Sequence, residues 1–381
     1  MPPMNHIRMN IRLKVLRFFN IKRCNQSFRN TPVTITLLIA QILVIFFIYV
    51  SLNVLVTENP PLVDFTNDYI ALLCGTEKFG TASNKTVIGI GPEQDTEADA
   101  VESQLLNVAR KIHLNSRTVL FTVINEAYLP FAYSWLCNTK PMNIHKSVLI
   151  VTTDKQAKAK LNSDWPDINI ISMDIDNLRG NQSYSQVGYI KITVKRTEMI
   201  QFLLMANIDV FVFEVDCLWL ANPLPGISFN QQDDIIVNPV AGTNNEIFAS
   251  GFIWLRSTCR AKIIWQKVTD LMVALGEKVK HLPETTVLET YEDENEQKYL
   301  AKLIREGYAD VTLKILPLEM YADGQWYKFT EVERLKLHPI VINNNWIIGN
   351  DAKIERAKLW NHWFVRTDLT CDMDLVYKTL Y

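Results

Sequence analysis

The sequence predicts an α/β fold with a largely parallel sheet flanked by helices. Between residues 118 and 213, strand-like apolar runs alternate with amphipathic segments, which is typical of parallel strands joined by helices. The last of these runs, Val-Phe-Val-Phe at 210–213, leads directly into two carboxylates. A composition of 48% hydrophobic and 21% charged residues is that of a globular protein, which excludes a disordered or collagen-like chain.

The individual elements follow from charge order and periodicity. The segment from Glu93 to His113 carries acidic residues early and basic residues late, an order that complements the dipole of a helix. The later segments divide into apolar runs and stretches with helical spacing. The expected strands are 118–124, 147–152 and 168–173, and the expected helices are 126–138, 155–162 and 189–206.

An uncharged run near the N-terminus indicates a membrane anchor. Residues 33–56 carry no charge, and a helix of that length crosses roughly 30 Å of hydrocarbon at about 1.5 Å per residue. Residues 1–57 hold seven Lys or Arg and no acidic residue, so the preference of basic residues for the cytoplasmic side places the N-terminus in the cytosol. We expect a type II protein with a cytosolic tail (1–32), a transmembrane signal anchor (33–56), a stem (57–92) and a luminal domain (93–381).

Further features agree with a luminal body in the Golgi or another secretory membrane. Asn84 and Asn181 begin Asn-x-Ser/Thr triplets and are candidate glycosylation sites. Five of the six cysteines follow the apolar run, so one or two disulfides are expected and at least one thiol is free or pairs between chains. After residue 57 the chain carries 32 basic and 41 acidic side chains, an excess of acid that excludes a broad nucleic-acid surface.

The acidic pair Glu214 and Asp216 is the main candidate site. Ligands of open α/β sheets bind beyond the carboxyl ends of the strands, where this pair stands. Carboxylate oxygens suit a hard divalent cation such as Mn²⁺ or Mg²⁺, which would bridge a diphosphate. On the two acids alone, a polar strand end followed by a turn is the favoured explanation, because short acidic triplets are common.

The surroundings of the pair resemble a known family. Residues 195–223 read KRTEMIQFLLMANIDVFVFEVDCLWLANP and are similar to the K…LL…G…VL…DxDxxWLxxP signature of the nucleotide-diphospho-sugar transferases, which are GT-A-type glycosyltransferases. Matching blocks lie in the same order at 123–138, 248–258, 296–297 and 343–354, so that the resemblance covers about residues 117–366. It implies a GT-A-like, Rossmann-type sheet that binds a nucleotide sugar.

The resemblance also implies roles for individual residues. The substrate would be a UDP sugar, and the acceptor a glycan or glycoprotein, with retention of the anomeric configuration. The metal ligands would be Glu214, Asp216 and Asn343; the donor-binding residues Asn125, Lys195, Glu214, Gly251 and Lys353; and the catalytic, sugar-side residues Glu296 and Gln297. The block 343–353 is expected to fold back over the acidic pair. The tryptophans 219, 254 and 346 are expected in the core in preference to a sugar-stacking role.

Two departures from the family pattern keep alternatives open. Glu214 replaces the first aspartate of the signature, and Asn343 replaces a histidine that often binds the metal. An asparagine carbonyl is an acceptable but weak ligand for these ions. A weak or inactive relative that binds nucleotide or glycan, or assists an active partner, is therefore one alternative. A retaining glycosidase, which also uses paired carboxylates, is the other.

Overall fold

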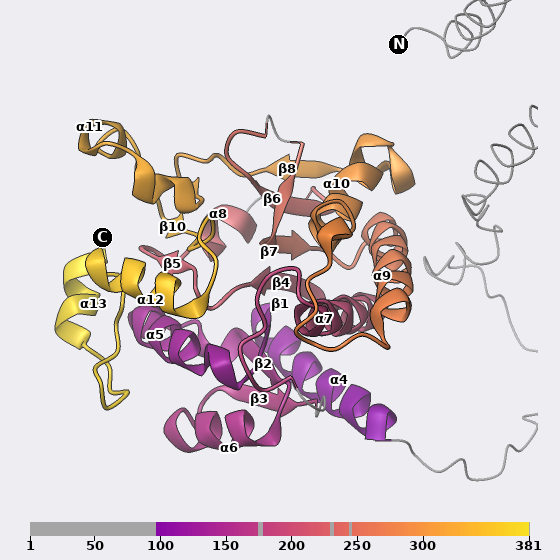
Figure 1. Cartoon of the computed structure of the whole chain (residues 1–381), viewed down its shortest axis with the longest axis horizontal. Helices are drawn as coiled ribbons and strands as arrows, with labels where there is room; N and C mark the ends of the chain where they lie inside the picture. The colour runs from indigo at the N-terminus through magenta and orange to yellow at the C-terminus, as the bar shows by residue number, and fades with distance from the viewer. Residues whose placement is uncertain (1–96, 174–177, 229–231, 244–245, 381) are drawn as a thin grey trace, which may run out of the picture. The chain divides into compact units, whose positions relative to one another are not determined.

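The computed structural model describes residues 97–173, 178–228, 232–243 and 246–380 (Figure 1). The expected cytosolic tail, transmembrane anchor, stem and Asn84 lie outside these ranges. Within them, no helix is both long enough and apolar enough to cross a membrane.

A seven-stranded, mostly parallel sheet organises the described chain, as the sequence predicts. The strand order is β3-β2-β1-β4-β7-β6-β8, and only β7 runs against its neighbours β4 and β6. The strands are β1 (Thr118–Ile124), β2 (Val148–Thr152), β3 (Asn169–Ser172), β4 (Asp209–Phe213), β6 (Ile235–Pro239), β7 (Phe248–Leu255) and β8 (Leu313–Ile315).

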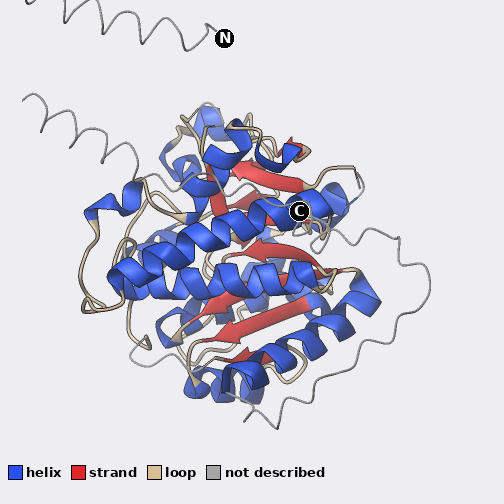
Figure 2. Ribbon diagram, turned by 90° about the vertical axis from the view of Figure 1, so that its right-hand side faces the viewer, coloured by secondary structure: helices blue, strands red, loops and turns tan. Residues whose placement is uncertain are grey.

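Helices cover both faces of this sheet (Figure 2). Alternate residues of β4 serve the two faces: Val210 and Val212 pack into one core, and Phe211 and Phe213 into the other. The first core is covered by α4 (Glu97–Ser116), α7 (Val187–Met205), α9 (Cys259–Val279) and α10 (Glu296–Arg305). The second contains residues of α5 (Leu129–Thr139), α6 (Lys155–Asp164), α8 (Leu224–Ser228), α12 (Asn350–Leu359) and α13 (Met373–Thr379).

A small second sheet brings the C-terminal part of the chain to the end of β4. Here β10 (Val341–Ile342) pairs antiparallel with β5 (Leu218–Trp219) and parallel with β9 (Tyr321–Ala322). Because β5 begins two residues after Asp216, this pairing holds residue 343 and its successors beside the acidic pair. A disulfide between Cys137 of α5 and Cys371 fixes the C-terminal segment a second time.

The observed elements differ from the expected ones in a few places. The segment expected to be one helix at 126–138 is a 3-10 turn (Glu126–Tyr128) followed by α5, whose start carries Pro130 in the first turn, where the missing N–H costs nothing. Trp219 and Trp254 lie in the core as expected, but Trp346 is 45% exposed, so a core role is wrong for it. Cys259 is disulfide-bonded as well, whereas Cys217 is a buried free thiol.

Candidate active site

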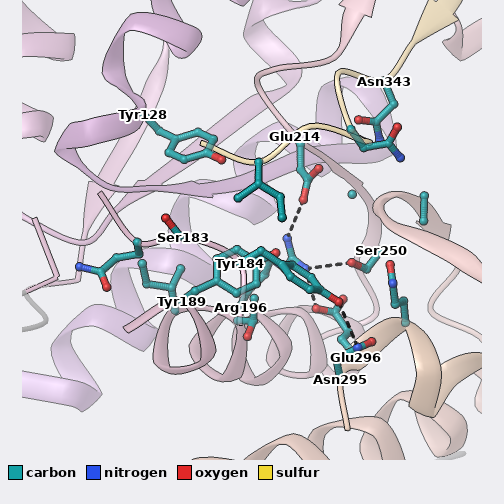
Figure 3. Close-up of a pocket in the computed structure, with 18 of the residues that line it drawn as sticks. Tyr128, Ser183, Tyr184, Tyr189, Arg196, Glu214, Ser250, Asn295, Glu296 and Asn343 are labelled. Carbon is teal, nitrogen blue, oxygen red and sulfur yellow. Dashed lines mark hydrogen bonds and ion pairs between the residues drawn. The ribbon is translucent and has the colours of Figure 1, made fainter. Parts of the chain in front are cut away.

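A cavity of about 800 Å³ opens where β1 and β4 end (Figure 3). Its walls come from distant parts of the chain: residues 122–125 at the end of β1, the loop at 181–184, one side of α7, Glu214, Ser250 and Gly251 of β7, the start of α10, and the loop 343–349 with Lys353. The position agrees with the rule that open α/β sheets bind ligands beyond the carboxyl ends of their strands.

Glu214 leaves β4 and extends over Gly251 of the neighbouring strand. A Cβ atom at Gly251 would lie 2.2 Å from Cδ of Glu214, so only glycine leaves room for this side chain. The carboxylate is 3.7 Å from Nη1 of Arg196 and 31% exposed. Burial raises the pKa of Glu214, and the nearby charge of Asp216 raises it further.

Arg196 and Glu296 form a buried ion pair beneath Glu214. Nη2 of Arg196 is 2.6 Å from Oε2 of Glu296, and both side chains are less than a tenth exposed. Glu296 is the first residue of α10, directly after its cap residue Asn295, whose side chain accepts from the backbone N–H of Lys298. Burial raises the pKa of Glu296, although the guanidinium of Arg196 acts in the opposite direction. The second carboxylate oxygen, Oε1, is buried without a partner.

Asp216 is paired with Lys353, which arrives from the C-terminal block. Nζ of Lys353 lies 2.6 Å from Oδ2 of Asp216, whose side chain is 2% exposed. Burial opposes the charged form of Lys353, but Asp216 outweighs it and the pKa of Lys353 is raised. Gly349 adopts φ +94° at the cap of α12, a backbone conformation that suits glycine and turns the chain into the helix that carries Lys353.

The loop after β10 brings Asn343 to the same cavity, as expected for the C-terminal block. Its backbone N–H donates to the carbonyl of Ala322, and its side-chain Oδ1 is buried without a hydrogen-bond partner. The two following asparagines have occupied side-chain oxygens: that of Asn344 accepts from Arg356, and that of Asn345 accepts from the N–H of Gly324. Among the three, Asn343 is the one with a free ligand oxygen in the cavity.

Asn125 has a structural function as well as a place in the cavity wall. Its Nδ2 donates to the carbonyls of Leu178 and Gly180, at 3.0 and 2.7 Å, which ties the loop at 178–184 to the end of β1. Asn181, the candidate glycosylation site, is exposed on this loop and lines the cavity. Tyr128 also lines the cavity, and burial raises its pKa to about 12, so that its phenol is neutral.

One expected donor contact does not reach the cavity. Lys195 is 49% exposed and pairs with Glu198 at 2.7 Å, and the cavity is lined instead by the next residue, Arg196. The reason is helical phase: the residues of α7 that line the cavity are 189, 192, 193 and 196, a spacing of three and four that excludes 195. This periodicity was the sequence signal for Arg196. The family resemblance pointed to Lys195 and did not identify Arg196.

Tyrosine side chains that the sequence analysis did not single out form another wall. The ring centroids of Tyr184 and Tyr291 are 5.2 Å apart, and those of Tyr184 and Tyr189 are 5.8 Å apart. All three tyrosines line the cavity, and Figure 3 shows Tyr184 and Tyr189 beside Arg196. These tyrosines come from a loop, a helix and a 3-10 turn, so only the folded chain brings them together.

The oxygen atoms of the site fit a divalent cation. Oδ1 of Asp216 and Oδ1 of Asn343 are both buried without partners, which is a costly arrangement unless a ligand satisfies them. Glu214 adds a carboxylate whose pKa is raised by burial and by the charge of Asp216. Over the described residues no group of three His, Cys, Asp or Glu is placed to hold a metal, so the ligand set would be two carboxylates and an amide oxygen.

The fold and the site together define an α/β protein with a cavity at its strand ends, beside an acidic pair and the cationic side chains of Arg196 and Lys353. The sequence profile of the nucleotide-diphospho-sugar transferase family matches residues 143–357, more than half of the chain. The chain belongs to this family and is a nucleotide-sugar-dependent glycosyltransferase.

Curated relatives come from Arabidopsis thaliana. A protein named UDP-D-xylose:L-fucose alpha-1,3-D-xylosyltransferase 3 is 21% identical over 298 residues, which are 74% of this chain and 76% of the relative. A beta-arabinofuranosyltransferase named RAY1 is 23% identical, over 69% of this chain and half of its own length. Among solved structures, the glycosyltransferase GlyE of Streptococcus pneumoniae covers 68% of this chain and 63% of its own, at 12% identity and a TM-score of 0.40.

Proposed function

We propose that this glycosyltransferase moves a sugar from a UDP sugar to a glycan or glycoprotein acceptor, with a divalent cation and with retention of the anomeric configuration. The observation that carries the proposal is the closure of the acidic pair by the C-terminal block. Glu214, Asn343 and Lys353 line one cavity of about 800 Å³, and Lys353 pairs with Asp216, which does not itself line this cavity. UDP-xylose is the first donor to test, because four relatives are named for it.

The proposed roles follow from charge and position. Glu214, Asp216 and Asn343 would hold Mn²⁺ or Mg²⁺, which neutralises charge on the diphosphate as it leaves the sugar. Lys353 orients Asp216 and offers its ammonium to a phosphate oxygen. Arg196 takes the second cationic position that we first expected of Lys195.

The sugar side of the cavity is formed by the start of α10. Glu296 and Gln297 both line the cavity, and Glu296 is locked by Arg196 with one oxygen left unpaired. We infer that Gln297 contacts the transferred sugar and that Glu296 fixes the charge and position of Arg196 next to Glu214. Gly251 allows the close approach of the Glu214 carboxylate to this region.

A weak or inactive relative is the second candidate, and one contact favours it. The ammonium of Lys353 already neutralises one oxygen of Asp216, which reduces the charge that would attract a cation. Such a protein would bind a nucleotide or glycan, or assist an active partner, without efficient transfer. Membership in a transferase family removes the glycosidase alternative.

The test is thermal unfolding of the purified full-length protein with UDP, with Mn²⁺, with both and with neither. A ligand at 100 times its dissociation constant adds roughly 2.7 kcal/mol of stability, which gives a measurable shift. We expect stabilisation that needs UDP and Mn²⁺ together and disappears in Asp216→Asn. Stabilisation by UDP alone would favour the weak relative, and no response to UDP in folded protein would contradict the donor proposal.

We further infer a single-pass type II protein of the Golgi membrane with residues 57–381 in the lumen. The basic tail, the uncharged run at 33–56 and the exposed position of Asn181 support this topology. Digestion with an N-glycosidase should shift the mobility of the cellular protein, and the shift should shrink in Asn84→Gln and in Asn181→Gln. A chain whose luminal domain is digested by protease in intact vesicles would refute the orientation.

A further inference from the structure

Two exposed apolar side chains stand on the loop that closes the cavity. Trp346 is 45% exposed and Ile348 is 72% exposed, and both line the cavity. Adjacent large apolar groups exposed at the edge of a pocket are characteristic of ligand contact surfaces. Trp346, which the sequence analysis expected in the core, therefore has the exposure and position of a ligand-contact residue.

The position of Trp346 is held by contacts that do not bury its ring. Its φ is +60°, a region that bulky residues rarely adopt and that persists only where the surroundings enforce it. The indole N–H donates to Oδ2 of Asp323 at 2.6 Å, and the same oxygen accepts from the N–H of Ala241 at 2.9 Å. The strained backbone conformation therefore serves to position the ring, because the ring itself gains little burial from it.

The neighbouring backbone enforces the same conformation. The N–H of Gly324 donates to Oδ1 of Asn345, and a Cβ atom at Gly324 would lie 2.0 Å from the carbonyl oxygen of Asn345. Arg356 donates to the carbonyl of Asn345 at 2.7 Å. Two other parts of the chain therefore hold Asn345, the residue that precedes Trp346.

The chemistry of the exposed ring suits a sugar. Its single hydrogen-bond donor is satisfied by Asp323, so what it offers a ligand is an apolar aromatic surface. The ammonium of Lys328 lies 5.7 Å from the ring centroid and adds a donor that a hydroxyl can use. An apolar surface beside a polar donor matches a pyranose, which has a C–H face and hydroxyls at its edge.

We propose that Trp346, with Ile348, is a platform for a sugar ring of the acceptor glycan, an inference that rests on the proposed function. The cationic groups suited to a diphosphate, Arg196 and Lys353, are only 8% and 16% exposed, whereas Trp346 is exposed at the edge of the cavity. The second substrate reaches this edge while the donor occupies the interior.

The experiment compares the full-length protein with Trp346→Ala and Trp346→Phe, with Leu335→Ala as a control. Leu335 is 74% exposed and does not line the cavity. Three quantities are measured: binding to an array of defined saccharides, release of UDP from the donor without acceptor, and the acceptor KM of transfer.

In Trp346→Ala we expect saccharide binding to fall and the acceptor KM to rise by about tenfold, the loss typical of one aromatic contact. Release of UDP without acceptor should keep its donor KM, Trp346→Phe should recover most of the acceptor affinity, and Leu335→Ala should match the wild type. Unchanged saccharide binding and acceptor KM would overturn the platform, and so would a rise in the donor KM, which would place the donor sugar there. A wild type that binds saccharides through Trp346 but releases no UDP would refute the proposed function and leave the platform standing.

Discussion

Replacing Gly251 by alanine should disable the site while leaving the fold intact. Phe213 of β4 pairs with Phe252 of β7, so the following residue Glu214 lies across from Gly251. The new Cβ would be 2.2 Å from Cδ of Glu214, against at least 3.4 Å for an ordinary contact, so the carboxylate must retreat by about 1.2 Å.

The size of the effect follows from that displacement. A misplacement of about 1 Å in a catalytic group costs on the order of 100-fold in rate, or about 2.7 kcal/mol. The forced change of rotamer costs only about 0.5–1.5 kcal/mol of stability. We therefore expect Gly251→Ala to lose about 100-fold in kcat/KM for UDP release and most of the joint UDP and Mn²⁺ stabilisation, with a small change in the unliganded melting temperature.

A second substitution distinguishes a steric contact with Glu214 from a general loss of packing as the cause of the effect. Glu214→Asp withdraws the carboxylate by one methylene, about 1.5 Å, which clears the space that the new Cβ needs. In this background Gly251→Ala should cost less than about threefold, because the two changes act on the same contact. An equal loss in both backgrounds would refute the steric argument. Gly276→Ala, on α9, serves as a packing control: its Cβ would lie 3.3 Å from Cγ2 of Val194, so it adds a mild crowding away from Glu214 and should leave activity unchanged.

Other predictions concern stability. Lys353→Met leaves the buried Asp216 unpaired, which should cost about 3–5 kcal/mol in denaturant unfolding and be partly recovered by Mn²⁺; an unchanged midpoint would contradict a buried pair. Burial lowers the pKa of His362 to about 4. Between about pH 6.5 and 4, the unfolded chain therefore binds a proton at this histidine that the folded chain does not bind. Through His362 alone, stability should fall as the pH falls in that window by at most about 1.4 kcal/mol per unit. His362→Gln should remove this part of the slope and leave the part due to His145, whose pKa burial also lowers to about 4. The disulfide joins cysteines 234 positions apart, so Cys371→Ser should cost about 2–4 kcal/mol under non-reducing conditions; equal stability would show that the link adds nothing.

The parallel half of the sheet could be predicted because its strands carry their own signal. β1, β2 and β4 are apolar on both faces, and the helices between them have the spacing of amphipathic helices. β5, β9 and β10 have two residues each, too few for any periodicity. These short strands form because the fold brings their partner strands beside them. The local sequence does not encode that pairing.

The residues of the candidate site also divide into those with a signal in the sequence and those that only the folded chain reveals. The acidic pair follows a strand, which made it a candidate, but the family resemblance was needed to favour a site there, and it also supplied Asn343 and Lys353. Whether Lys195 or Arg196 lines the cavity depends on how α7 is rotated against the sheet. Neighbouring residues of a helix point about 100° apart, and the observed rotation turns Arg196 toward the cavity. The exposure of Trp346 depends on contacts with Asp323 and Gly324, over twenty residues away.

The small sheet also bears on how the protein is made. A ribosome releases the chain from the N-terminus, so the seven strands of the large sheet, complete at residue 315, emerge before the segment that carries Asn343 and Lys353. The cavity wall then forms by a pairing of β10 with β5 across more than a hundred residues, a contact of the kind that forms slowly. A nascent chain thus has a scaffold before it has a site, and translation that stops before residue 343 yields a protein without the asparagine and lysine that close its cavity.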